Sequence, residues 1–74
     1  MKTPLEMRNQ LIRDYGNQAY HFAVEMVVVA VDLKDTAYAR LVADAVQILR
    51  REGFHRYPKK ESPVWILQSR LRFP

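Results

Sequence analysis

Residues 20–32, YHFAVEMVVVAVD, decide the fold of this 74-residue chain. Read at helical period, Phe22 and Met26 continue an apolar stripe that begins in the preceding segment. Read at period two, the larger apolar residues at 20, 22, 24 and 26 alternate with His21, Ala23 and Glu25, and the five valines of the stretch favour a strand. We predict a helix, because the stripe continues in phase through Gly16, and we keep a strand over 22–32 as the alternative.

The segment before this stretch carries the start signals of a helix. Thr3 is a typical N-cap residue, Pro4 suits the first helical position, and Glu6 completes a capping box with Thr3. Gly16 either ends this helix or is a close-packing point inside a longer one. The first principal helix is therefore predicted over about 3–32, with a break at 16–17 left open.

A second helix is predicted over 36–52. Asp35 or Thr36 caps its start, and Gly53 is a C-terminal stop signal. Its apolar residues recur at three- and four-residue steps and predict a buried face: Tyr38, Leu41, Val42, Ala45, Ile48 and Leu49. The chain is thus predicted to be mostly α, with two principal helices forming a hairpin. The alternative is an α+β fold with a short C-terminal strand.

The apolar run Met26–Val31 predicts self-association. On a helix, six successive apolar residues wrap the whole circumference and leave no face for water. Because the rest of a 74-residue chain has few residues that could cover this run, we predict a homodimer. The predicted dimer interface is Met26, Val27, Val28, Val29 and Val31. The alternative is that the C-terminal tail folds over the run, with Trp65 and Ile66 covering it.

Charge divides the chain into two parts. Residues 1–49 hold five Lys and Arg against six Asp and Glu, whereas residues 50–74 hold seven against two. We expect a single domain over 1–74, with a helical core at 1–53 and an extended, basic, aromatic tail at 54–74.

The composition argues against catalysis and against a bound metal or cofactor. The chain has no Cys and two Gly, so it lacks thiolate ligands and a glycine-rich phosphate loop. His21 and Glu25 stand one helical turn apart, but two ligands do not make a metal site. We therefore predict a non-enzymatic protein with no cofactor.

The basic tail is the predicted binding site. Cations bind phosphates and aromatic faces stack on bases, so the mixture favours nucleic acid as the partner. The predicted binding residues are Arg50, Arg51, Arg56, Tyr57, Lys59, Lys60, Arg70 and Arg72. The alternative is an interaction module that docks on an acidic protein, such as a small regulator or inhibitor, including one carried by a phage or other mobile element.

Location is predicted from two absences in the sequence. A secreted chain this small usually needs disulfides, and this one has no Cys. No stretch approaches the roughly 20 apolar residues of a membrane span. We expect a cytoplasmic protein without a membrane partner.

Two resemblances accompany these interpretations. The stretch IRDYGNQA at 12–19, followed by Ala23, Asp35 and the amphipathic run to Leu49, resembles small alphaproteobacterial helical-hairpin proteins of unassigned function. This resemblance covers about residues 11–50 and implies a helical fold with no assigned activity. The strand interpretation is similar instead to the first strand and helix of ferredoxin-like RNA-processing folds, including nuclease-like proteins of CRISPR adaptation. In those, an Asp that ends the first strand would match Asp32.

Overall fold

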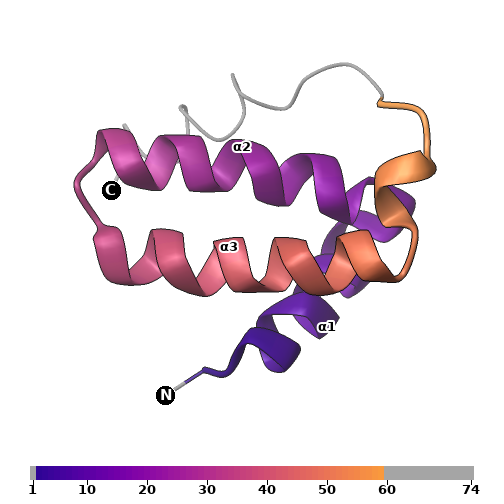
Figure 1. Cartoon of the computed structure of the whole chain (residues 1–74), viewed down its shortest axis with the longest axis horizontal. Coiled ribbons are helices and arrows are strands. Elements are labelled where there is room, and N and C mark those ends of the chain that lie inside the picture. Colours follow the sequence, from indigo (N-terminus) through magenta and orange to yellow (C-terminus); the bar gives the residue numbers. More distant parts are fainter. Residues whose placement is uncertain (1, 60–74) are drawn as a thin grey trace.

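The computed structural model describes residues 2–59, which form three helices and two short 3₁₀ turns (Figure 1). In chain order, the elements are α1 (Pro4–Tyr15), η1 (Gly16–Gln18), α2 (Ala19–Asp32), α3 (Thr36–Arg51) and η2 (Phe54–Arg56). The mostly α fold is confirmed. The predicted extended tail beyond Lys59, and the alternative strand within it, lie outside the described residues.

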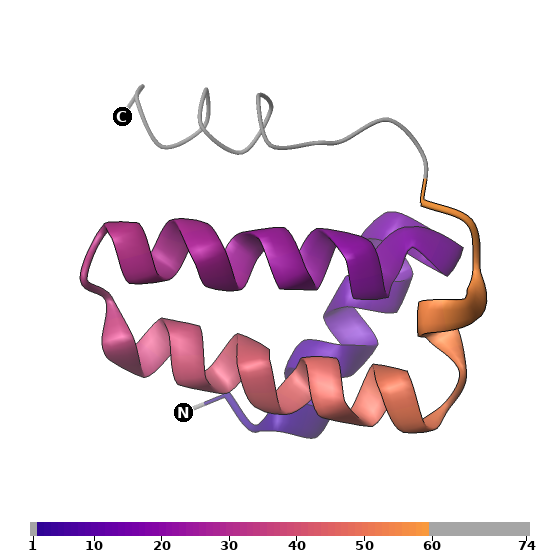
Figure 2. The ribbon, with the colours of Figure 1, turned by 45° about the horizontal axis from the view of Figure 1, so that its top comes forward.

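Helices α2 and α3 form the predicted hairpin. They run side by side in opposite directions, and α1 crosses behind α3 on its way to the start of α2 (Figures 1 and 2). The alternative strand over 22–32 is not supported, because all of these residues lie within α2. Asp32 therefore ends a helix, and not the strand that the ferredoxin-like resemblance requires.

Local side-chain contacts explain where the helices begin. The Thr3 hydroxyl accepts a hydrogen bond from the Glu6 backbone at 3.2 Å, and the Glu6 carboxylate accepts one from the Thr3 backbone at 3.1 Å. This capping box satisfies two backbone donors that have no partner within the helix. At the start of α3, Asp35 is the N-cap and accepts from the Tyr38 backbone at 3.1 Å. The choice between Asp35 and Thr36 is settled in favour of Asp35.

Gly16 breaks the first predicted helix into α1 and α2. Its φ of 59° and ψ of −130° lie outside the helical region and are strained for a residue with a side chain. The chain turns through η1, and the rings of Tyr15 and Phe22 stack across the turn with centroids 3.9 Å apart. The break therefore reorients α1 so that it can pack against α2 and α3.

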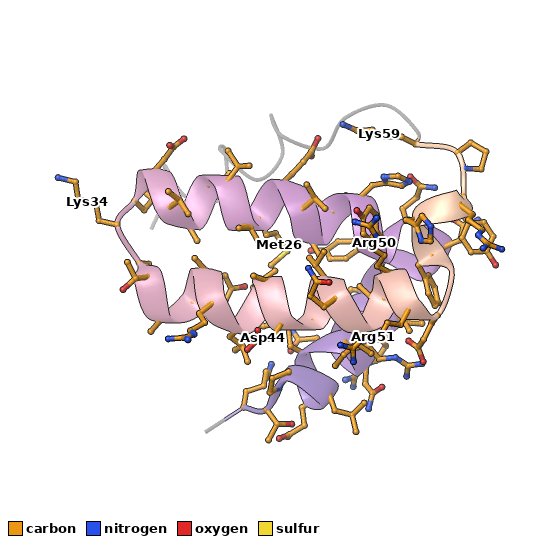
Figure 3. The ribbon with its side chains drawn as sticks, viewed as in Figure 1. Met26, Lys34, Asp44, Arg50, Arg51 and Lys59 are labelled. Atoms are coloured by element: carbon orange, nitrogen blue, oxygen red, sulfur yellow. The ribbon has the colours of Figure 1, made fainter. Side chains whose placement is uncertain are left out.

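All three helices contribute to one core. Its buried members are Met7 and Leu11 of α1, Ala19 and Ala23 of α2, and Val42, Ala45 and Leu49 of α3. Alanines at the contact let the helix axes approach closely, and Met26 fills the space between α2 and α3 (Figure 3). The predicted buried face of α3 is confirmed at Val42, Ala45 and Leu49. Leu41 and Ile48 are half-buried, and Tyr38, near the hairpin turn, is 38% exposed.

Replacing Gly16 with Asn should destabilise the fold by about 1–3 kcal/mol, because Asn tolerates left-handed helical geometry but not a ψ of −130°. Apart from Gly16 itself and its two chain neighbours, no atom lies within 4 Å of the position that a Cβ would take, so the cost comes from the backbone conformation. Gly53→Asn is the matched control, since Gly53 has left-handed helical geometry with equally open surroundings. Urea unfolding measures both, and equal destabilisation by the two changes would contradict this account of the break.

Candidate functional site

Three exposed arginines gather where α3 ends. Arg50 and Arg51 occupy the last turn of α3, and Arg56 lies in η2 immediately after it. Arg50 and Arg51 lie toward the same end of the molecule, and Lys34 lies at the opposite end, in the α2–α3 turn (Figure 3). Among residues 2–59, none of the three arginines forms an ion pair. We refer to Arg50, Arg51 and Arg56 as the arginine cluster.

The acidic residue closest in sequence to the arginine cluster is Glu52, and it forms an ion pair with Arg8. Glu52 accepts two hydrogen bonds from Arg8 of α1, from Nε at 2.7 Å and from Nη2 at 2.6 Å. The bond to Glu52 raises the pKa of the Arg8 guanidinium above its usual value. This bidentate pair fastens α1 to the end of α3. It also neutralises Glu52, which is the one acidic residue in 45–59. No ion pair within residues 2–59 therefore offsets the positive charge of the arginine cluster.

An open depression lies beside the cluster. It is lined by residues of the α3–η2 turn and the segment after it: Glu52, Gly53, Phe54, Arg56, Tyr57 and Pro58. Tyr57 is 46% exposed, and its ring centroid lies 5.8 Å from that of Phe54. The depression therefore presents an aromatic ring and a guanidinium together at the surface.

The segment 57–59 is held against α2 by three side chains, from Gln18, His21 and Glu25. His21 Nε2 donates to the Tyr57 carbonyl at 2.7 Å, since a carbonyl oxygen only accepts. Gln18 Nε2 donates to the Pro58 carbonyl at 2.9 Å. The Lys59 ammonium lies 3.2 Å from a carboxylate oxygen of Glu25.

Gln18, the N-cap of α2, and His21 and Glu25 within α2 form one row because they stand three and four positions apart. Sequence reasoning considered His21 and Glu25 as metal ligands and missed their contacts with 57–59. The available signal was this polar row on an otherwise apolar segment. Within residues 2–59, no group of three or more His, Cys, Asp or Glu side chains is placed to hold a metal ion.

The predicted binding residues therefore differ in their surroundings. Arg50, Arg51, Arg56 and Tyr57 are exposed and belong to one end of the molecule. Lys59 instead forms an ion pair with the buried carboxylate of Glu25, which offsets much of its positive charge. The remaining predicted residues, Lys60, Arg70 and Arg72, lie outside the described residues.

The predicted dimer interface divides between two faces of α2. Met26 and Val27 pack against the core and Val29 is half-buried, whereas Val28 and Val31 are more than half exposed. The homodimer thus stays a prediction, and its accessible residues are Val28 and Val31.

Comparison of the chain with protein-family models, with curated proteins and with solved structures found no match. In the part of the chain that the structure describes, none of the helices combines the length and the apolar character that crossing a membrane requires.

A double-mutant cycle of Glu25→Gln and Lys59→Met should measure the contact that holds 57–59 on α2. We expect a coupling free energy of about 0.5–1 kcal/mol, since one partner is buried and the other is half exposed. The readout is urea unfolding of the wild type, both single variants and the double variant. Strictly additive effects of the two changes would show that the ion pair contributes nothing to stability.

Proposed function

We propose that this protein binds nucleic acid through the arginine cluster and Tyr57. The observation that carries the proposal is the uncompensated charge at the end of α3, where Arg8 neutralises Glu52 while three exposed arginines remain without an ion pair in residues 2–59. Guanidinium groups bind phosphate oxygens with paired hydrogen bonds, and each phosphate contact releases counterions from the nucleic acid.

The attraction for phosphate comes from the arginine side chains and not from the end of the helix. The C-terminal end of a helix carries a partial negative charge from its free carbonyl groups, and this charge repels anions. Arg50 and Arg51 offset it in the last turn of α3, and Arg56 adds a further cation beyond it. Recognition of this kind follows phosphate spacing and charge and carries little base-sequence preference.

The exposed ring of Tyr57 favours binding of single-stranded over double-stranded nucleic acid. Its exposed ring adjoins the open depression that also contains Arg56, and its backbone carbonyl is held by His21. A base that is not paired can stack on such a ring, whereas a base inside a duplex is covered by its neighbours. The arginine cluster would then contact the phosphates on either side of the stacked base.

Docking on an acidic protein through the same arginines is the second candidate, because carboxylates and phosphates are both recognised by guanidinium groups. The two candidates differ in salt dependence. The logarithm of nucleic acid affinity falls steeply and linearly with the logarithm of the salt concentration, because binding releases condensed counterions. No measurable binding to DNA or RNA at low salt would exclude the first candidate and leave the second.

Changing Arg50, Arg51 and Arg56 together to Gln should weaken binding to mixed-sequence oligonucleotides regardless of sequence. For single strands, the slope of log affinity against log salt should fall by about 0.7 for each phosphate that an arginine no longer neutralises. Arg40→Gln and Lys34→Gln are the controls, since both remove exposed cations. Lys34 lies at the opposite end of the molecule (Figure 3), and Arg40 lies ten residues, or about 15 Å, before Arg50 along α3. Fluorescence anisotropy at several salt concentrations gives the slopes, and equal effects of cluster and control changes would refute the assignment.

Tyr57→Ala should cost single-strand binding about 1–3 kcal/mol if its ring stacks on a base, and should affect duplex binding less. Tyr57→Phe is the matched control, because it keeps the ring and removes only the hydroxyl. An alanine variant with equally reduced affinity for duplex and single strands would show that Tyr57 does not stack on a base.

A further inference from the structure

Helix α2 presents a second row of residues beside the polar one. Val24, Val28 and Val31 stand four and three positions apart and are 38%, 57% and 58% exposed. Three neighbouring valines on one face of a helix form an apolar stripe that water solvates poorly. We call these three residues the valine row.

The segment that follows η2 lies beside α2, on the side next to the valine row. The Tyr57 carbonyl contacts His21 and the Pro58 carbonyl contacts Gln18, whereas the Lys59 side chain extends to Glu25, one helical turn after His21. Val28 stands three residues after Glu25, which places it next on the same side of the helix, about 4.5 Å further along the axis. Val28 therefore lies within one helical turn of the Glu25–Lys59 ion pair.

The remaining sequence has the length and composition to cover the row. Residues 60–74 follow Lys59 and include six large apolar residues: Val64, Trp65, Ile66, Leu67, Leu71 and Phe73. The four residues from 60 to 63 span up to about 13 Å when extended. From Glu25 to Val31 the helix advances about 9 Å. The apolar residues that start at Val64 can therefore reach the whole valine row.

Charge favours the same occupant. Helix α2 contains the acidic residues Glu25 and Asp32 and no Lys or Arg, whereas residues 60–74 contain three basic residues and one acidic residue. Lys59 already pairs with Glu25. A second copy of α2 would instead bring acidic side chains against acidic side chains, which costs free energy at an apolar interface.

We propose that residues 60–74 pack in cis on the valine row of α2, and that the contacts of Gln18, His21 and Glu25 with segment 57–59 direct them there. The valine row is then an internal docking face of the chain. This proposal does not depend on nucleic acid binding, and its test contains no nucleic acid, so the two proposals can fail independently.

Trp65 reports on this packing because it is the single tryptophan of the chain. In the full-length protein, its emission should be blue-shifted and protected from acrylamide quenching. Val28→Ser should shift the emission to the red and increase quenching, with far-ultraviolet circular dichroism unchanged, because Val28 is largely outside the core. Leu5→Ser is the matched control, since Leu5 is 56% exposed on α1 and lies away from the proposed path. Solvent-like emission in the wild type, or emission that Val28→Ser leaves unchanged, would overturn the proposal.

Sedimentation equilibrium distinguishes packing in cis from a second copy. The proposal expects a monomer whose Trp65 emission does not change on dilution. A dimer that dissociates on dilution together with a red shift of Trp65 would show that the valine row is covered in trans, and would overturn the proposal in favour of the predicted homodimer.

A proximity measurement keeps the proposal testable if changes in the valine row disturb folding. The chain has no Cys, so a nitroxide can be attached at one introduced position while the valine row is kept intact. A label at Asp32→Cys, at the end of α2, should quench Trp65 strongly, and a label at Glu6→Cys, on α1, should not. Equal quenching from the two positions would contradict packing on α2.

Discussion

A helix with little polar surface has to be covered on most of its circumference, and α2 imposes this constraint on the rest of the structure. Its alanines pack against α3 and α1, where their small side chains allow close approach of the helix axes. Its polar row carries segment 57–59. The break at Gly16 lets α1 pack against α2, and the turn at Gly53 brings segment 57–59 back to it. The elements before and after the hairpin thus both cover part of the surface of α2.

The buried carboxylate of Glu25 is a consequence of the same constraint. A charged group within an apolar helix is costly unless it is paired, because burial removes its hydration. Lys59 supplies an opposite charge from a distant part of the sequence. One ion pair therefore both lowers the cost of burying Glu25 and sets the path by which the chain leaves the helical core.

The internal ion pairs also determine which cations remain accessible. Arg8 is committed to Glu52 and Lys59 to Glu25, so these basic residues stabilise the fold. Arg50, Arg51 and Arg56 form no ion pair with any other described residue. The proposed nucleic acid surface consequently depends on which basic residues form ion pairs in the folded chain, and a count of basic residues in the sequence does not separate the paired from the unpaired ones.

The sequence by itself determined the features that depend on neighbours within a few positions: the capping box of Thr3 and Glu6, the buried stripe of α3, and the concentration of basic residues after residue 49. It left the structure of 20–32 ambiguous, because a continuous apolar run satisfies both the helical and the strand period. Tertiary structure decided that segment as α2. It also decided the pairing of Arg8 with Glu52, 44 residues apart, and of His21 with the Tyr57 carbonyl, 36 residues apart. Local patterns carry no information about such distant partners, because only the packing of helices around a shared core brings them together.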